Sequence, residues 1–164
     1  MQDLLQEMGI FRSFKPATYA AKHSTDWHNM ENFQYVTYVV MGGGITAGTK
    51  LKIQKATNKS GSGATNVAAP FVGNVYYTNK ASAAKASYAK TSVTTSGSVH
   101  VVTIGASSSA TYVFTVDATA ATSASKMYLG LVGVNSSASS ASMAGLAILH
   151  GARYQGASMP DFTL

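Results

Sequence analysis

The distribution of apolar residues along the chain constrains its fold more than any other feature of the sequence. From Phe33 to Met41, β-branched and aromatic residues follow one another, and the run ends at glycines 42–44. Such a run, bounded by a turn signal, is typical of a β-strand. Charged residues make up only 11% of the chain, whereas long amphipathic helices need a charged face. We therefore expect strands and turns rather than helices.

The rest of the chain predicts further strands. Residues 49–55 alternate, with Leu51 and Ile53 facing inward and the lysines outward, and we expect them to form an antiparallel hairpin with the strand at 33–41. Residues 126–134 and 142–150 are apolar on both faces and are expected to lie centrally in a sheet. The remaining expected strands are 97–105 and 111–116, and residues 67–77 are strand-like but broken by Pro70. The segment 79–90 fits either a helical turn or a mobile excursion.

Together these segments predict an all-β fold, namely a β-sandwich or jelly roll of about 6–8 antiparallel strands. Because Ala, Ser, Thr and Gly dominate the composition, we expect a core built from small side chains.

Residues 1–32 differ from the rest and predict an extended N-terminal arm. They hold the only tryptophan and show little strand periodicity. The segment Asp3–Phe11 is compatible with a short helix, and Pro16 favours extended chain from Phe14 to Tyr19. The arm either packs along its own domain or docks on a neighbouring subunit. Residues 33–164 then form the β-domain, which ends in a short C-terminal tail.

The charge distribution suggests what kind of partner the chain meets. The net charge is +6, and seven lysines but no acidic residue lie between Glu31 and Asp117. A region of one sign attracts an acidic partner. Arginine, which dominates base recognition and bidentate phosphate binding, occurs only at positions 12 and 153. An acidic protein surface is therefore favoured over nucleic acid.

Neither a membrane segment nor a catalytic or metal site is expected. No run approaches the roughly 18 apolar residues of a membrane span, and the N-terminus lacks a signal-peptide pattern, so we expect a soluble protein made in a cytoplasm. There is no cysteine, and His23, Asp26, His28 and Glu31 lack the spacing of a closed ligand set. Glycines 42–44 precede a lysine-bearing strand rather than the helix that a dinucleotide site requires. Without a nucleophile elbow or paired carboxylates, the sequence indicates a protein that is not an enzyme and has no cofactor.

Two stretches carry a resemblance to a known family. Ile45–Thr49 followed by Leu51–Ala56, and Lys126–Leu131 followed by Ala144–Tyr154, resemble the capsid decoration, or cement, proteins encoded among the head genes of tailed phages. The resemblance covers roughly residues 33–154. Lys55, Lys59 and the segment 79–90 depart from the family's pattern.

The resemblance implies a virion protein that binds the outside of an icosahedral capsid and stabilises it by bridging subunits of the major capsid protein. It also implies a homo-oligomer, with a trimer favoured by the three-fold positions of shells. Apolar anchors, most of them aromatic, and lysines are the expected contact residues: Phe11, Phe14, Tyr19, Trp27, Lys50, Lys52, Lys55, Met159, Phe162 and Leu164. The alternative is a carbohydrate- or receptor-binding module of a phage head or tail fibre, with Tyr76, Tyr77 and Tyr88 as its platform.

Overall fold

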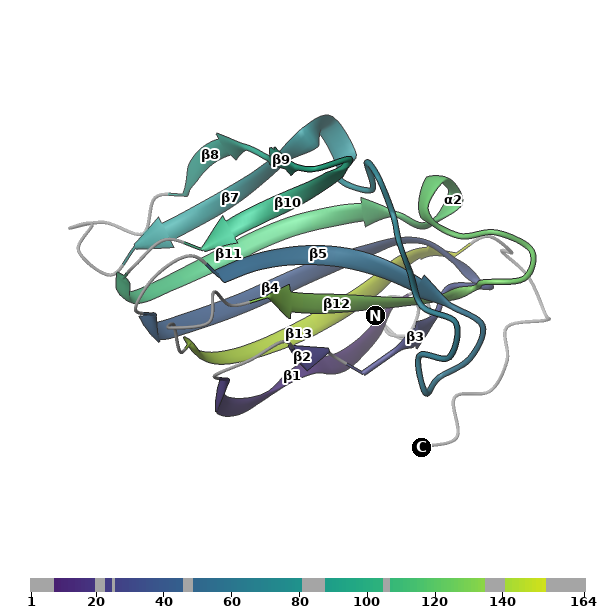
Figure 1. Ribbon diagram of the computed structural model, residues 1–164, viewed down its shortest axis with the longest axis horizontal. Coiled ribbons are helices and arrows are strands. Elements are labelled where there is room, and N and C mark those ends of the chain that lie inside the picture. The colour runs from purple at the N-terminus through teal and green to yellow at the C-terminus, as the bar shows by residue number, and fades with distance from the viewer. Residues whose placement is uncertain are drawn as a thin grey trace, which may run out of the picture.

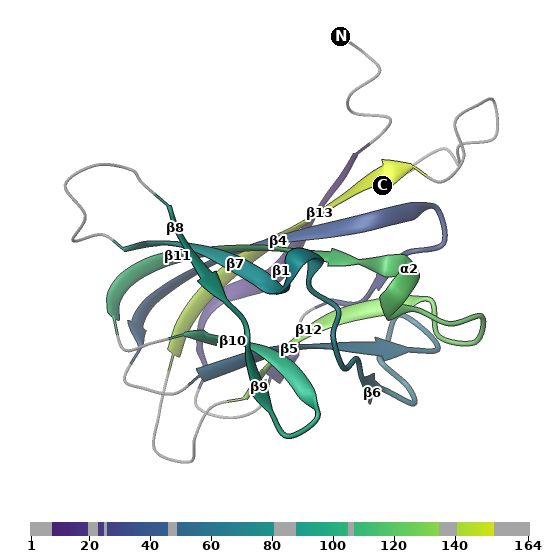
Figure 2. The same cartoon turned by 90° about the horizontal axis from the view of Figure 1, so that it is seen from above.

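The chain folds into two antiparallel β-sheets that pack face to face. The computed structural model describes residues 8–19, 23–24, 26–45, 49–80, 88–104, 107–134 and 141–152. Figure 1 shows the strands running along the long axis, and Figure 2 shows the two sheets as separate layers. The predicted β-sandwich is confirmed, with more strands than the sequence indicated.

The first sheet has six strands, and its long members lie next to one another. The spatial order is β1 (Gly9–Tyr19), β13 (Ala141–Ala152), β4 (Phe33–Ile45), β11 (Ser107–Asp117), β7 (Val75–Lys80) and β8 (Ala89–Ser92). β4 has β13 on one side and β11 on the other along nearly its whole length. It is therefore the centre of this sheet.

The second sheet has seven strands, several of them very short. The order is β2 (His23–Ser24), β12 (Tyr128–Val134), β5 (Thr49–Ala56), β10 (Val99–Ile104) and β9 (Thr94–Ser96), and β3 (His28–Asn29) and β6 (Thr65–Asn66) pair with β12 and β5. Two short helical turns, η1 (Val72–Asn74) and α2 (Ala118–Ala121), interrupt the strands. None of the helices in the described ranges has the length and apolarity to cross a membrane.

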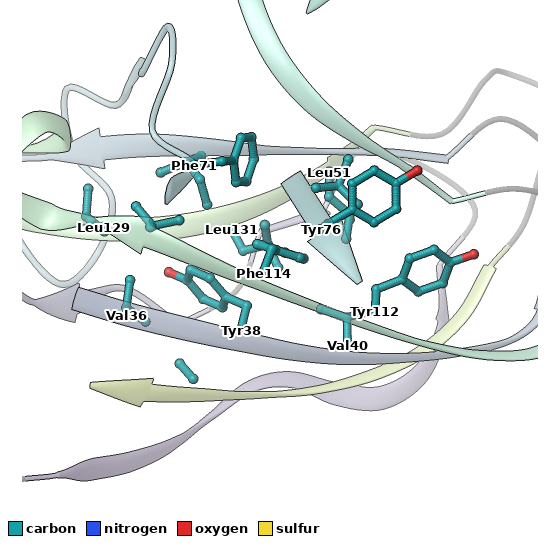
Figure 3. Packing of buried hydrophobic residues seen from close by; sticks show 14 of the residues in the cluster. Val36, Tyr38, Val40, Leu51, Phe71, Tyr76, Tyr112, Phe114, Leu129 and Leu131 are labelled. Atoms are coloured by element: carbon teal, nitrogen blue, oxygen red, sulfur yellow. The ribbon is translucent and has the colours of Figure 1, made fainter. Parts of the chain in front are cut away.

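The core lies between the sheets and is aromatic. On β4, Val36, Tyr38 and Val40 are buried and alternate with residues that remain partly exposed. The Tyr38 ring lies 5.6 Å from Phe114 of β11, and Phe71 meets Phe114 edge to face at 5.5 Å. Figure 3 shows these rings packed against Leu131 of the opposite sheet. The expectation of a core of small side chains is wrong, because the few large residues are concentrated on the inner faces.

Three local predictions are also wrong. β4 and β5 do not form a hairpin: β4 lies in the six-stranded sheet between β13 and β11, and β5 lies in the other sheet between β12 and β10. The strand expected at 67–77 begins only at Val75, after the turn η1. Gly9–Phe11, the end of the segment expected to be helical, belongs to β1; its residues up to 7 lie outside the described ranges. The segment 79–90, for which the sequence left two alternatives, begins in the last residues of β7 and ends in the first residues of β8. Its residues 81–87 lie outside the described ranges.

The segment expected to be an arm contributes strands to both sheets. β1 pairs with β13 from Gly9 to Tyr19, including the region predicted to be extended around Pro16. β2 and β3 then pair with β12 of the other sheet. Of the two alternatives for this segment, its described residues follow the first and lie along the chain's own sandwich.

The buried hydroxyl of Tyr38 yields a prediction about stability. It has no hydrogen-bond partner among the described residues, so Tyr38→Phe removes an unsatisfied polar atom. We expect the free energy of unfolding to stay the same or to rise by about 1 kcal/mol. Phe114→Ala, the matched core truncation, should lower it by about 3–5 kcal/mol. Urea denaturation measures both, and a loss above about 1 kcal/mol in Tyr38→Phe would contradict the assignment.

Candidate functional site

The outer face of the six-stranded sheet carries apolar side chains in register across neighbouring strands. Leu146 of β13 lies opposite Val39 of β4, which lies opposite Val113 of β11, and Val113 lies opposite Tyr77 of β7. These outward positions alternate with the buried ones, as the pleat of a strand requires. Adjacent rows add further apolar residues, namely Ile10, Ile148 and Met41. We call this surface the apolar face.

Several of these side chains are strongly exposed. The exposed fractions are 58% for Ile10, 48% for Met41, 42% for Tyr77 and 40% for Leu146. In a monomer, a contiguous apolar patch of this kind usually marks a contact surface. The apolar face is therefore the strongest candidate for an interaction site in the part of the chain that the structure describes.

Charged groups lie only at the borders of the apolar face. By strand register, Arg12, Lys90 and Asp117 lie on this side of the sheet. A polar border is also formed by His150, whose Nε2 atom lies 2.9 Å from Thr37 Oγ1. Burial lowers the pKa of His150, which favours the neutral ring. An apolar centre with a polar rim is the usual anatomy of a protein interface.

The apolar face is hollowed next to the turn η1. A depression of about 360 Å³ is lined by Val72, Gly73, Tyr77, Lys90, Val113 and Thr115, among others. Its lining combines an exposed aromatic ring, an ammonium group and a hydroxyl. A partner's side chain or a sugar ring fits this chemistry.

The opposite sheet presents a different surface. Lys50 and Lys52 lie on its outer side, and Lys50 Nζ donates to Ser96 Oγ at 3.2 Å. Lys55 is three residues beyond Lys52, so it falls on the other side of the strand, and it is half-buried. The prediction that all three lysines face outward together is therefore wrong for Lys55.

Of the aromatic residues expected to act as contacts, the structure brings Phe11 and Trp27 together, at one cavity. Phe14 is only 1% exposed and belongs to the core, because a register shift in β1 places it opposite Gly145 on the inner side. Phe11 remains 38% exposed. Tyr19 lies in β1 but its side chain is not described, and Met159, Phe162 and Leu164 lie outside the described residues. Trp27 is half-buried on the outer side of β12.

A separate cavity of about 370 Å³ opens at the edge of the sandwich. Phe11, Arg12, Trp27, His28, Phe33, Tyr128 and Leu149 contribute to its lining, with Asp26 and Asn29. Arg12 and Asp26 form an exposed ion pair there at 3.5 Å. We call it the edge cavity. No group of three or more histidine or acidic side chains with metal-binding geometry occurs within the described ranges.

Sequence reasoning missed the apolar face although a signal for it was present. Residues 142–150 are apolar on both faces, a pattern that predicts burial on both faces. In the structure Leu149 and Ala147 are buried, whereas Leu146 is exposed. A strand that is apolar on both sides is thus compatible either with burial of both sides in the protein or with one exposed side that a binding partner covers.

The fold and this face define a β-sandwich protein with an exposed apolar sheet face. No family model matches the chain, and no curated protein matches it. Among solved structures it is similar to the SPBc2 prophage-derived protein YomS, with 11% sequence identity, a TM-score of 0.43, and coverage of 86% of this chain and 92% of that one. A likeness at this level does not establish a shared function.

Burial of His28, which lines the edge cavity, makes the free energy of unfolding depend on pH. Burial lowers the pKa of His28 from 6.5 to about 4 in the folded chain, and Asp26 opposes this shift. Below pH 6.5 the unfolded chain takes up a proton that the folded chain does not. The free energy of unfolding therefore decreases as the pH is lowered. Between pH 7.5 and 4.5 we expect this group to contribute a loss of about 2–3 kcal/mol.

Urea denaturation of the wild type and of His28→Gln at both pH values measures this contribution. The variant lacks the titrating ring and should lose correspondingly less stability on acidification, while the carboxylates act alike in both proteins. Parallel losses in the two proteins would refute the role of His28.

Proposed function

We propose that the chain is a structural protein of a bacteriophage particle that binds the outside of the capsid and stabilises it by bridging subunits of the major capsid protein. The resemblance of residues 33–154 to phage decoration proteins supports the phage origin. The protein would be made in the host cytoplasm, be located on the capsid surface and perform no enzymatic reaction.

The observation that carries the proposal is the apolar face. Its central row, Leu146, Val39 and Val113, is bordered by charge but contains none. Its residues stand on the long central strands of a sandwich, so they are presented in a fixed arrangement. A rigid surface loses little conformational freedom on binding, which favours affinity.

The size of the face explains why such a protein would act in many copies. Four strands about 4.8 Å apart, each contributing about seven residues at about 3.3 Å, give roughly 450 Å². Stable interfaces bury roughly 800 Å² on each partner, so one face alone makes a weak contact. Joining copies in a homo-oligomer, for which we favour a trimer, makes several such contacts act together.

The position of the lysines changes the proposed orientation. Lys50 and Lys52 lie on the opposite sheet from Leu146, so one flat shell surface does not contact both. We assign the shell contact to the apolar face. The two lysines then point away from the shell, where they are available to an acidic neighbour.

Charge reversal on either face tests this assignment. We expect Leu146→Glu to weaken binding to isolated shells at least tenfold, because it places a carboxylate in an apolar interface. Lys50→Glu, the matched change on the opposite face, should alter binding less than about twofold if that face points away from the shell. Co-sedimentation with shells assembled without the protein measures both, and circular dichroism controls for folding.

The opposite pattern, with Lys50→Glu abolishing binding and Leu146→Glu retaining it, would assign the shell contact to the lysine-bearing sheet. Failure of the wild type to bind the shells would contradict the decoration role. Quantitative mass spectrometry of native particles gives an independent check, because a shell-wide role requires a copy number close to that of the shell protein or a simple fraction of it.

The hollow beside Tyr77 favours the alternative of a carbohydrate-binding module. Tyr77 and Tyr88 are exposed, and Tyr77 lines the hollow. Tyr76 does not belong to this platform, because its ring is buried in the core against Tyr112. Binding on a glycan array that Tyr77→Ala removes would support this function, and binding that persists in the variant would exclude this hollow as its site.

A further inference from the structure

One line of side chains crosses the whole six-stranded sheet on its outer side. Strand register places one residue of each strand in this line, in the order Arg12, Leu146, Val39, Val113, Tyr77 and Lys90. The strands β1 and β8, which carry its two ends, are the edges of the sheet (Figure 1). The central residues are apolar and the end residues are cations. A partner that covers the whole line therefore reaches a positive charge at each edge.

The two cations differ in their surroundings. Arg12 forms an exposed ion pair with Asp26 at 3.5 Å, so a neighbouring carboxylate already balances its charge. Lys90 is exposed, and no ion pair joins its ammonium group to a described residue. Asp117 does not balance it, because it lies at the end of β11, where its Oδ1 atom accepts hydrogen bonds from Thr119. The β8 end of the line thus carries the charge that a partner has to match.

Lys90 also lines the hollow beside Tyr77. The two residues are paired across β7 and β8, and both contribute to this depression of about 360 Å³. The rest of the lining is mostly apolar and consists of Val72, Gly73, Val75, Val113, Phe114 and Thr115. No acidic residue is among the described residues that line it. An apolar hollow with one ammonium group suits a ligand that combines apolar surface with one negative charge.

We propose that the hollow beside Tyr77 receives an acidic residue of a protein partner. Its carboxylate binds the Lys90 ammonium group, while apolar residues next to it in the partner cover Val113 and Leu146. The identity of this partner as the major capsid protein rests on the proposed function. The recognition of a carboxylate flanked by apolar side chains rests on the hollow and its lysine.

The reason for an acidic residue is the cost of covering a charge. A neutral surface that docks on Tyr77 also removes water from the adjacent Lys90, and desolvation of an ammonium group without a counter-charge is unfavourable. A carboxylate replaces the lost water with a charge-assisted hydrogen bond. A basic surface is rejected, because like charges would be brought together. Lys90 thus adds to the apolar face a selectivity that apolar contacts alone do not provide.

A second copy of this chain fits the same line poorly. Sheets that pack face to face keep their strands roughly aligned, and pairs of identical chains are usually related by a two-fold axis. If such a pair is centred on the line, Lys90 lies over either Lys90 or Arg12 of the second copy. The like charges oppose this contact. The charge pattern therefore favours a different, acidic partner.

The experiment titrates the isolated protein with two capped pentapeptides, Gly-Leu-Glu-Leu-Gly and Gly-Leu-Gln-Leu-Gly, which have the same size and differ in one charge. At pH 7.5 and low salt, we expect the glutamate peptide to bind about fivefold more tightly, the value of a partly exposed ion pair. NMR shifts of the methyl groups of Val72 and Val113 report binding in the hollow. Equal affinities, or no binding of either peptide, would overturn the proposal.

Lys90→Gln and Lys59→Gln separate this contact from the general positive charge of the protein. Both variants remove one exposed lysine, but Lys59 does not line the hollow. Lys90→Gln should bind both peptides with the same affinity, whereas Lys59→Gln should keep the fivefold preference. Lys90→Glu should prefer the corresponding lysine peptide, Gly-Leu-Lys-Leu-Gly. Thermal denaturation checks that the variants fold. If the preference for glutamate survives in Lys90→Gln, the carboxylate binds elsewhere and the proposal fails.

Measurements on shells distinguish this inference from the proposed function. We expect Lys90→Gln to weaken co-sedimentation with shells about fivefold and Lys59→Gln to leave it unchanged. Peptide preference without any shell binding would support the carboxylate site and contradict the proposed function. Shell binding that does not respond to Lys90→Gln would overturn the assignment of the shell protein as the partner.

Two other occupants of this surface have their own signatures. Self-association of the isolated protein that Leu146→Glu abolishes would assign the apolar face to a second copy. Binding of a neutral sugar that Tyr77→Ala removes and Lys90→Gln leaves unchanged would assign the hollow to carbohydrate. Either result would overturn the proposal.

Discussion

The pairing of β4 with a long strand on each side is the constraint on which the rest of the structure depends. It places Tyr38 over Phe114 on the inner side and Val39 between Leu146 and Val113 on the outer side. A slip of one residue would exchange these two sets of side chains, which would expose an aromatic core residue. One register thus determines both the packing of the interior and the composition of the apolar face.

The edges of the six-stranded sheet are poorly suited to binding a further strand. β1 carries Pro16 and shows register shifts on both sides of Phe14, and bulges and prolines are known to block pairing at sheet edges. At the other edge, β8 spans only Ala89–Ser92. This arrangement argues against open-ended strand addition at either edge.

Much of the fold was predictable from the sequence, and the site was not. Periodicity identified β4, β5 and β13 because alternation is a local property. It did not reveal that β4 and β5 belong to different sheets, since strand partners are set by contacts between distant residues. It also did not distinguish the buried Leu149 from the exposed Leu146, because both are leucines in one apolar run. The role of Phe14 was lost for a similar reason, as the register shift in β1 leaves no mark in the sequence.

The segment from Gly9 to Asn29 hydrogen-bonds first to β13 of one sheet and then to β12 of the other. Sliding one sheet over its partner would break pairing at two edges simultaneously. In mechanical terms, this edge resists shear, because one continuous stretch of chain ties the two sheets together.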